Sequence, residues 1–299
     1  MSTMAISIPE RTFSYSIPWK SDNSHLGDHP GNQRGLGFEY RGNLPLVDYP
    51  DARRMDISRS LRDPFEQIQV RTFNQESPTP VYIVCDMSSS MQFKGLKRNP
   101  EGESIRKLDK AVQIAASIGS AVAHAGDVYS LIGYDDEVQQ DTLLPLGNRL
   151  SELLAQLSLV AANKALGQGS EGVLQVPQFL SQKKSLVFWL SDFHMPLAYV
   201  EKTLAAMSIH QVIPVVIWDD AEIHKLPRLG FSNMLDPETG LSRTLFFTPA
   251  LRQQIEDAFV QRKHALQQLF LKFDSPALYL QDDYHPDLMT QYFEQYLSL

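Results

Sequence analysis

Carboxylates and hydroxyls gather at the ends of two apolar runs in this sequence. The first run, "VYIVCD", ends at Asp86, and the serines of "MSSSM" follow it directly. The second run, "SLVFWLSD", ends at Asp192, and the loop "LGQGSEGV" between the two runs contributes one more serine. Oxygen ligands of this kind suit a hard cation such as Mg²⁺, or alternatively Mn²⁺ or Ca²⁺. The candidate metal ligands are Asp86, Ser88, Ser90, Ser170 and Asp192.

A site of this composition holds its ion largely through neutral hydroxyls, so the charge of the ion is only partly neutralised. Such an ion keeps an open position that an outside carboxylate can fill. An Asp or Glu of a partner protein would then complete the metal shell. The residue types therefore predict a metal-dependent protein-binding site rather than an enzyme.

Two other interpretations of the same residues stay open. Serines that follow a strand often only shape a turn or cap a helix. Asp86 would also be the nucleophile if the chain were a metal-dependent phosphohydrolase, although Ser88 stands where such enzymes carry a second aspartate. A nucleotide-binding site has less support, because no glycine-rich phosphate-binding motif follows any of the apolar runs.

The elements that position these residues alternate between strand and helix patterns. The runs "VYIVCD", "DVYSLIGY", "SLVFWLSD" and "QVIPVVIWD" are typical of strands buried on both faces. Helical spacing covers the stretch from Ile105 to Val122, a shorter stretch near 150–157, one that begins near Ser170, and one over 196–208. This alternation predicts an α/β fold with a doubly wound, mostly parallel sheet flanked by helices. Parallel strands would bring Asp86 and Asp192 to one edge of the sheet.

The two ends of the chain differ from this central part. Residues 1–80 predict an N-terminal extension of loops and short strands that packs on the core, and residues 81–220 form the α/β part. Residues 221–299 complete the same fold with a hairpin whose turn is "DPETG", a helix capped by Thr248 and Pro249, a strand at "ALYL" and a terminal helix from about 286. Pro214 is expected near the start of its strand or at a sheet edge.

Composition narrows the classes of partner. The formal net charge of −8 argues against nucleic acid as a ligand, and no run is long enough for a membrane helix, so membrane insertion is not expected. The single cysteine, Cys85, excludes an internal disulfide and fits a reducing compartment. The N-terminus lacks the pattern of a secretory signal. We therefore expect a cytoplasmic protein.

Other charged residues are assigned simpler roles. Asp135, Asp136 and Glu137 are predicted to form a solvated acidic turn rather than a second metal site. His194, two residues beyond Asp192, is predicted to be a loop residue without a chemical role. Because Asp86 and Asp192 would repel each other without metal, replacing Asp192 by alanine is expected to leave the ion-free protein as stable as before or more stable.

The pattern Asp86-x-Ser88-x-Ser90, with a later loop hydroxyl and a distant Asp192, resembles the von Willebrand factor A domain and its metal-ion-dependent adhesion site. The resemblance implies that residues 81–220 form such a domain and that Asp86 and Asp192 reach the metal through water. In that family a threonine stands in the later loop, and Ser170 keeps the hydroxyl there.

The chain also resembles the bacterial MoxR-associated proteins of the domain-of-unknown-function family fifty-eight. The upstream segment "RRMDISRSLRDPFEQIQVRTFNQE" and the downstream segment "DDAEIHKLPRLGFSNMLDPETG" carry this likeness, which covers about residues 38–299. Ile57 occupies a position where a tryptophan is expected, and no N-terminal membrane helices are found. The resemblance implies a MoxR-type AAA+ ATPase as partner, and a chaperone-like role in assembling or maturing other proteins.

Overall fold

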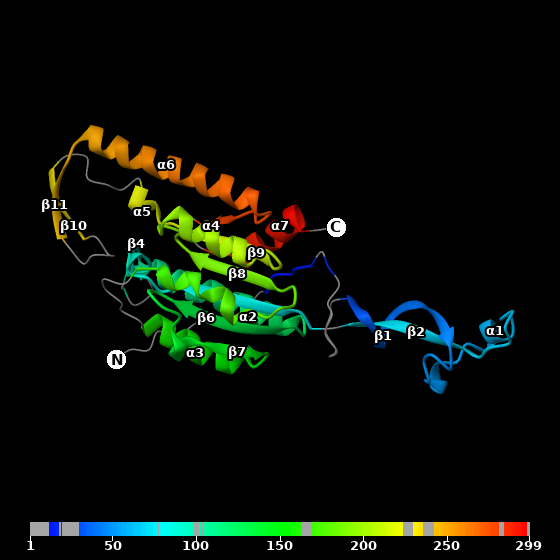
Figure 1. Ribbon diagram of the computed structural model, residues 1–299. Coiled ribbons are helices and arrows are strands. Elements are labelled where there is room, and N and C mark those ends of the chain that lie inside the picture. The colour runs from blue at the N-terminus through cyan, green and yellow to red at the C-terminus, as the bar shows by residue number, and fades with distance from the viewer. Residues whose placement is uncertain are drawn as a thin grey trace.

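A six-stranded sheet forms the centre of the protein (Figure 1). The structure is a computed structural model. It describes residues 12–17, 19, 30–76, 78–98, 102, 104–162, 169–223, 230–235, 242–280 and 284–297. In spatial order the strands are β12 (Leu278–Leu280), β9 (Gln211–Ile217), β8 (Leu186–Ser191), β3 (Pro80–Asp86), β6 (Val128–Tyr134) and β7 (Leu144–Gly147).

The order of these strands is that of a doubly wound sheet. Counted along the chain, the six strands lie in the spatial order 3-2-1-4-5-6, and only β7 runs antiparallel to its neighbour. The order reverses between β3 and β8, so the connections that leave these two strands run to opposite sides of the sheet. Ligands bind at such a switch point in sheets of this kind. The predicted fold class, a mostly parallel α/β sheet flanked by helices, is confirmed.

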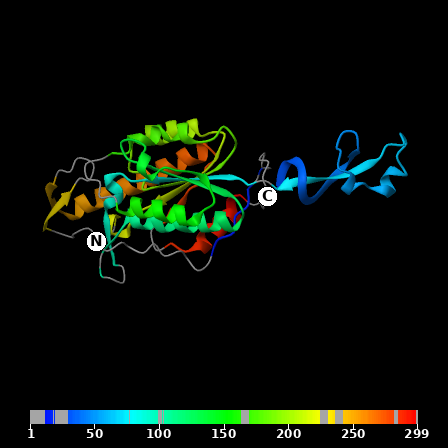
Figure 2. The ribbon, with the colours of Figure 1, turned by 90° about the horizontal axis from the view of Figure 1, so that it is seen from below.

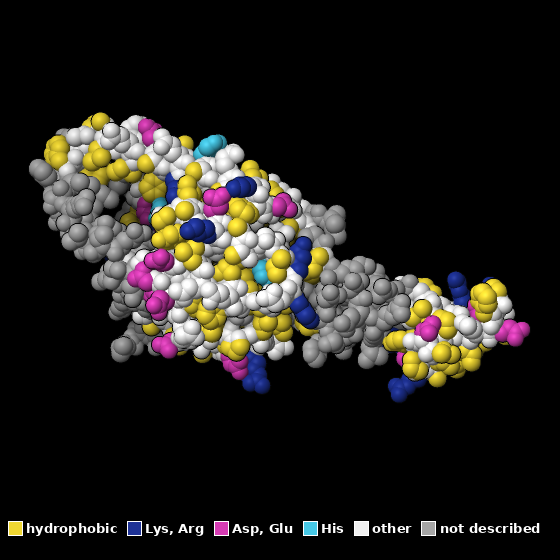
Figure 3. All heavy atoms as spheres, in the orientation of Figure 1, with side chains coloured by type: hydrophobic (Ala, Val, Ile, Leu, Met, Phe, Trp, Pro, Cys, Tyr) yellow, Lys and Arg dark blue, Asp and Glu magenta, His cyan; other side chains and the backbone are white. Residues whose placement is uncertain are grey.

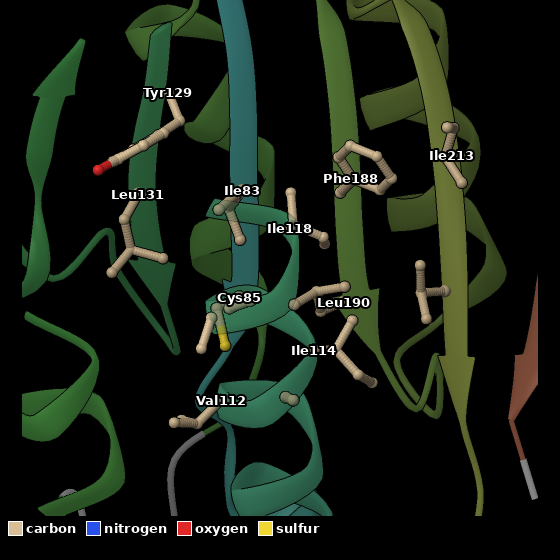
Figure 4. Close-up of a cluster of buried hydrophobic side chains, with 14 of the residues drawn as sticks. Ile83, Cys85, Val112, Ile114, Ile118, Tyr129, Leu131, Phe188, Leu190 and Ile213 are labelled. Carbon is tan, nitrogen blue, oxygen red and sulfur yellow. The ribbon is translucent and has the colours of Figure 1, made fainter. Parts of the chain in front are cut away.

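Helices cover both faces of the sheet because the side chains of each strand alternate between two cores. One core contains Val81, Ile83 and Cys85 of β3 and is closed by three helices. Figure 4 shows Ile83 and Cys85 in this core, beside Ile114 and Ile118. The other contains Tyr82 and Val84 and is closed by two. The first set is α2 (Lys107–His124), α3 (Leu150–Ala162) and α7 (Pro286–Tyr296), and the second is α4 (Leu197–Ala206) and α6 (Pro249–Lys272).

One predicted helix is replaced by two short turns. The helix expected to begin near Ser170 is instead a pair of 3₁₀ turns, η4 (Glu171–Leu174) and η5 (Val176–Phe179). Pro177 explains the difference, because a proline inside a helix lacks the N–H that the helix needs and clashes with the preceding turn. The expected helix at residue 170 was therefore wrong, although the chain does turn there.

The C-terminal part agrees with the sequence pattern. β10 (Gly230–Leu235) and β11 (Ser242–Phe247) pair antiparallel, and the turn "DPETG" lies outside the described residues. The Thr248 hydroxyl accepts a hydrogen bond from the Leu251 N–H at 3.1 Å, with Pro249 at the first helical position, so the predicted cap of α6 is confirmed. β12 and α7 lie where a strand and a terminal helix were predicted.

An arm extends away from the sheet on the right in Figures 1 and 2, on the side where β3 begins. It consists of β1 (Pro30–Pro45) paired with β2 (Gln69–Glu76), and between them lie η1 (Ala52–Arg54) and α1 (Ile57–Ser60). By contrast, Phe13 lies in the core, where it packs against the ring of Phe293 at a centroid distance of 6.2 Å. The boundaries at residues 80 and 220 stay a prediction.

Short elements surround the carboxyl edge of the sheet. They are η2 (Ser89–Gln92), β4 (Lys94–Arg98), β5 (Ser104–Arg106), η3 (Gln140–Thr142) and α5 (Asp220–Ile223). Among the helices that the structure describes, none combines the length and the apolar character needed to cross a bilayer.

Candidate metal centre

Asp86 and two serines form a hydrogen-bonded group at the end of β3. The Asp86 Oδ1 atom accepts a hydrogen bond from the Ser88 N–H at 2.9 Å. The Ser88 and Ser90 hydroxyls lie 3.1 Å apart, and all three residues are buried. Ser88 precedes η2, but its side chain makes no capping hydrogen bond there. Capping therefore does not account for the Ser88 hydroxyl, which is directed instead toward Ser90.

Ser191 joins the two aspartates. Its hydroxyl donates to the Asp86 Oδ2 atom at 2.6 Å and also accepts from the Phe193 N–H at 2.9 Å. Ser191 is the last residue of β8, the strand beside β3, and Asp192 follows it. The sequence interpretation did not include Ser191. Its place in "LSD", one residue before a candidate ligand, was the only available signal.

The loop that carries Asp192 is held from several directions. The Trp218 Nε1–H donates to the Asp192 carbonyl at 2.8 Å. Phe193 has a φ of 53°, which is unusual for a residue with a side chain. Arg262 of α6 donates to the carbonyl of Phe193 at 3.1 Å and also to that of Met195. These contacts keep the backbone of the loop in place despite its left-handed residue.

A buried lysine contacts Asp192 directly. The Lys107 Nζ atom lies 2.5 Å from the Asp192 Oδ2 atom and 2.7 Å from the Glu222 Oε1 atom, and the lysine side chain is 1% exposed. The other Asp192 oxygen accepts from the His194 N–H at 3.1 Å. Sequence reasoning missed both Lys107 and Glu222. A signal for Lys107 existed in the sequence, because it precedes the apolar residues Ala111 and Ile114 at helical spacing.

A second ion pair lies next to this cluster. The Lys110 Nζ atom is 2.7 Å from the Asp219 Oδ2 atom. The Asp219 N–H donates to the Glu222 Oε2 atom at 3.3 Å, so the two pairs are connected through the start of α5. His194 borders the cluster as well, with its Nε2 atom 4.0 Å from the Glu222 Oε1 atom and its ring stacked on Trp218.

Ser170 lies in a loop at the same edge of the sheet. The Gly172 N–H donates to the Asp135 carbonyl at 2.9 Å, which ties the Ser170 loop to the end of β6, next to β3. Ser170 is buried, yet within the described part of the chain it forms no hydrogen bond with the other four candidate ligands. That all five residues converge on one ion stays a prediction.

The acidic turn after β6 differs from the prediction at one position. Asp136 and Glu137 are exposed, as expected, but Asp135 is buried. The Asp135 carboxylate accepts from the Glu137 N–H at 3.2 Å and from the Gln139 Nε2–H at 2.6 Å. The expectation of a solvated Asp135 was wrong because its carboxylate folds back to close the turn.

Burial and neighbouring charge shift the pKa values of the two aspartates in opposite directions. Burial, with a further contribution from the Asp192 charge, raises the pKa of Asp86 from 3.8 to about 6. Burial alone would also raise the pKa of Asp192, but the charge of Lys107, the neighbouring His194 and the hydrogen bonds from both residues together outweigh burial and lower that pKa below the ordinary value. Burial lowers the pKa of His194, so its side chain is neutral at pH 7.

The charges around the site leave an excess of negative charge. The carboxylates of Asp192 and Glu222 contact the Lys107 ammonium. The Asp86 carboxylate is close enough to feel the charge of Asp192, and the Arg262 guanidinium also interacts electrostatically with Asp192. Across the described residues no three His, Cys, Asp or Glu side chains form a metal-binding group. An ion here would therefore need the Ser88 and Ser90 hydroxyls, and their position beside excess negative charge fits a hard cation.

Comparison with known proteins places the chain among relatives from bacteria. Uncharacterized proteins of Mycobacterium bovis and Mycobacterium tuberculosis are each 24% identical over 277 residues, which is 91% of this chain and 84% of theirs. A Paracoccus denitrificans protein described as an "uncharacterized protein in moxR 3'region" is 32% identical over 90 residues, 30% of this chain and 86% of that protein.

Among solved structures, BatB of Bacteroides thetaiotaomicron is 12% identical, covers 73% of this chain and 98% of its own, and has a TM-score of 0.45. The von Willebrand factor A domain of SpRpn10 is 11% identical, covers 72% and 95%, and has a TM-score of 0.35. The profile of the family described as "Protein of unknown function DUF58" matches residues 49–265. This match spans most of the chain, so the protein belongs to the DUF58 family.

Proposed function

We propose that this protein is a non-enzymatic binding module whose divalent ion receives a carboxylate from a partner protein. The observation that carries the proposal is the pair of buried Ser88 and Ser90 hydroxyls, 3.1 Å apart, beside the Asp86 carboxylate. Mg²⁺ is the favoured ion, with Mn²⁺ or Ca²⁺ as alternatives. Bound there, the ion would supply an electrophilic position for an Asp or Glu side chain.

Each residue of the chain has a separate part in this proposal. Ser88 and Ser90 would bind the ion directly, and Asp86, oriented by the Ser88 N–H and the Ser191 hydroxyl, would stabilise its charge. Asp192 would act from the neighbouring strand, and Ser170 from the loop beside β6. Because most of these ligands are neutral, the bound ion would keep affinity for an external carboxylate.

The partner we infer is a MoxR-type AAA+ ATPase, acting with this protein in the cytoplasm in the assembly or maturation of other proteins. The support is indirect: the Paracoccus denitrificans relative is named for its place in a moxR 3' region. That name describes the relative's gene neighbourhood. For this chain, the ATPase is a hypothesis that a binding experiment can test.

The experiment compares binding of the cognate AAA+ ATPase to the wild type and to a Ser88→Ala/Ser90→Ala double variant. Calorimetry with Mg²⁺ should show binding to the wild type and its loss in the double variant or with EDTA. Ser117→Ala is the matched control, since Ser117 is a buried serine that bonds Tyr284, away from the sheet edge. Full binding by the double variant, or binding that ignores EDTA, would contradict the proposal.

The competing function is a metal-dependent phosphohydrolase with Asp86 as nucleophile. The structure offers a reason to rank it second: both Asp86 oxygens accept hydrogen bonds, from the Ser88 N–H and the Ser191 hydroxyl, which reduces their nucleophilicity. Incubation with Mg²⁺ and generic phosphate esters tests it directly. Turnover that disappears in Asp86→Ala would favour the enzyme over the binding module.

A further inference from the structure

The Lys107 side chain brings a positive charge into the candidate metal centre. Its ammonium lies 2.5 Å from the Asp192 Oδ2 atom, which is one of the two carboxylates that the sequence assigns to the ion. The ammonium also lies 5.6 Å from the centre of the Phe93 ring, and the lysine is 1% exposed. A buried ammonium needs paired anions to offset its loss of hydration. Lys107 is therefore an integral part of the site.

Glu222 offers the same ammonium a second partner. The Lys107 Nζ atom is 2.7 Å from the Glu222 Oε1 atom, while the Asp219 N–H holds the other Glu222 oxygen at 3.3 Å. Glu222 comes from α5, whereas Asp192 follows β8, so the two carboxylates approach the ammonium from different elements. The ammonium would stay paired through Glu222 if Asp192 turned toward another cation.

We propose that Lys107 is a built-in competitor of the divalent ion: its ammonium neutralises Asp192 in the ion-free site and stays with Glu222 when an ion engages Asp192. The proposal rests on the proposed function, because it assumes an ion at the site. It adds that Lys107 sets how tightly that ion binds. The ion-free protein gains a stable site, and the affinity for the ion is reduced by the competition.

The neighbouring pair provides a matched control. Lys110 and Asp219 are also a lysine and an aspartate in contact, with a 2.7 Å separation, and Lys110 lies one helical turn beyond Lys107. No contact joins Lys110 to Asp192 within the described residues. Substitutions in this second pair change the charge near the site to a similar extent without removing the competitor.

The test measures Mn²⁺ and Mg²⁺ affinity by calorimetry on the full chain. Lys107→Met should bind either ion at least about tenfold more tightly than the wild type. The reason is that, at a partly buried site, the repulsion between the ion and one nearby ammonium exceeds the free energy that corresponds to a tenfold change in affinity. Lys110→Met should change the affinity much less. An equal change in the two variants would mean that only the overall field matters, and would overturn the proposal.

The double variant Lys107→Met/Glu222→Gln separates competition from net charge. It removes one positive and one negative charge, so the net charge of the site is unchanged, but the ion no longer competes with an ammonium for Asp192. It also avoids leaving Glu222 buried and unpaired, which guards against unfolding of the single variant. Tighter ion binding than in the wild type, together with a larger rise of the melting temperature on adding Mn²⁺, is the expected result.

Three outcomes are decisive. Ion binding that appears or tightens in the double variant supports the proposal, even if the wild type binds too weakly to detect. Ion binding by the wild type that is unchanged in the double variant overturns the competition and leaves the proposed function standing. Absence of Mn²⁺ and Mg²⁺ binding in every variant, Lys107→Met included, overturns the metal-dependent function and the competition together.

Discussion

Asp86 and Asp192 lie at the ends of adjacent strands, but their surroundings have opposite effects on the stability of their charged forms. Asp86 receives hydrogen bonds from the neutral Ser88 N–H and Ser191 hydroxyl, and it lies close to another carboxylate. Asp192 contacts the Lys107 ammonium. At the level of single residues, the charge on Asp86 therefore lowers the stability of the folded protein, whereas the charge on Asp192 raises it.

The raised pKa of Asp86 predicts a pH-dependent gain from its neutral isostere. Between pH 3.8 and about 6 the native Asp86 binds its proton more tightly than the unfolded chain does, so its effect on stability becomes less favourable as pH rises through this window. Asp86→Asn should therefore raise the free energy of unfolding at pH 7 by up to about 3 kcal/mol. The gain should vanish near pH 4.

Urea denaturation in EDTA at a series of pH values measures this difference. The exposed Asp141→Asn serves as the control, and it should follow the wild type throughout. A gain of equal size at pH 4 and pH 7 would show that the Asp86 charge is not its cause.

The structure reverses the expectation for Asp192→Ala. Repulsion between two aspartates suggested an unchanged or more stable ion-free protein. Because Asp192 pairs with buried Lys107, we now expect the substitution to lower the free energy of unfolding by about 3 kcal/mol. This value is at the lower end of the range for breaking a buried ion pair, because Glu222 still pairs with the Lys107 ammonium. Thermal and urea melts in EDTA test this, with Asp192→Asn/Lys107→Met/Glu222→Gln, which leaves no member of the cluster charged and unpaired, expected to be closer to the wild type than Asp192→Ala.

At the level of elements, α6 positions the site from outside the sheet. Arg262, in the middle of this helix, donates to carbonyls of the loop that carries Asp192. Leu266 and Phe270 pack the same helix into the core beneath α4 and the sheet. The loop conformation, with its left-handed Phe193, is therefore supported by a helix that lies about seventy residues away along the chain.

The end of α6 offers a test of local backbone strain. The Asp274 N–H donates to the Leu271 carbonyl and the Ser275 N–H to the Phe270 carbonyl, which is the pattern of a Schellman cap. Asp274 has a φ of 51°, where glycine is preferred. Asp274→Gly should raise the free energy of unfolding by about 0.5–1 kcal/mol, because the relief of strain exceeds the added entropy of the unfolded chain.

Thermal denaturation compares this variant with Asp274→Ala, which keeps a Cβ in the same conformation. The alanine variant should be less stable than the glycine variant. If the two variants melt alike, the left-handed conformation does not strain the end of α6.

At the level of the whole molecule, the arm is the part least supported by the core. Its strands β1 and β2 pair with each other, and Met55 adds a single bridge to Val70. Several large apolar side chains between the two strands are exposed, among them Val47 (91%), Leu61 (83%) and Phe65 (80%). Figure 3 shows apolar side chains over the surface of this arm. A two-stranded hairpin alone is at most marginally stable in water.

We therefore expect a peptide of residues 30–76 to be largely unstructured, with no cooperative thermal transition in far-UV circular dichroism. Because Pro30 pairs with Glu76 at the base of the arm, a short Gly-Ser linker between these two positions can replace the whole arm. That shortened chain should keep the melting temperature of the wild type within a few degrees. Cooperative melting of the peptide would identify the arm as an independent domain.

Much of the fold was predictable from local pattern. Buried strands, amphipathic helices and the Thr248 cap depend on neighbours a few residues away, so each could be recognised in the sequence. Pro214 differs from its prediction, because it is the fourth residue of β9, which lies between β12 and β8. Its place is still compatible with a missing N–H: within the described residues β12 pairs with β9 only from Val215 onward, so one side of β9 has no partner strand at the proline. Reasoning from local pattern also brought Asp86 and Asp192 to one edge of the sheet.

The sequence by itself determined the α/β sheet and the two aspartates at its carboxyl edge, because strand ends and periodicity are local properties. Only the tertiary structure decided what surrounds these aspartates. Lys107 meets Asp192 across 85 residues and Glu222 across 115, and Ser191 meets Asp86 across 105. No pattern within one segment encodes such contacts. They arise when α2, α5 and the strand ends pack together and exclude water, and burial then makes each charge depend on its partner.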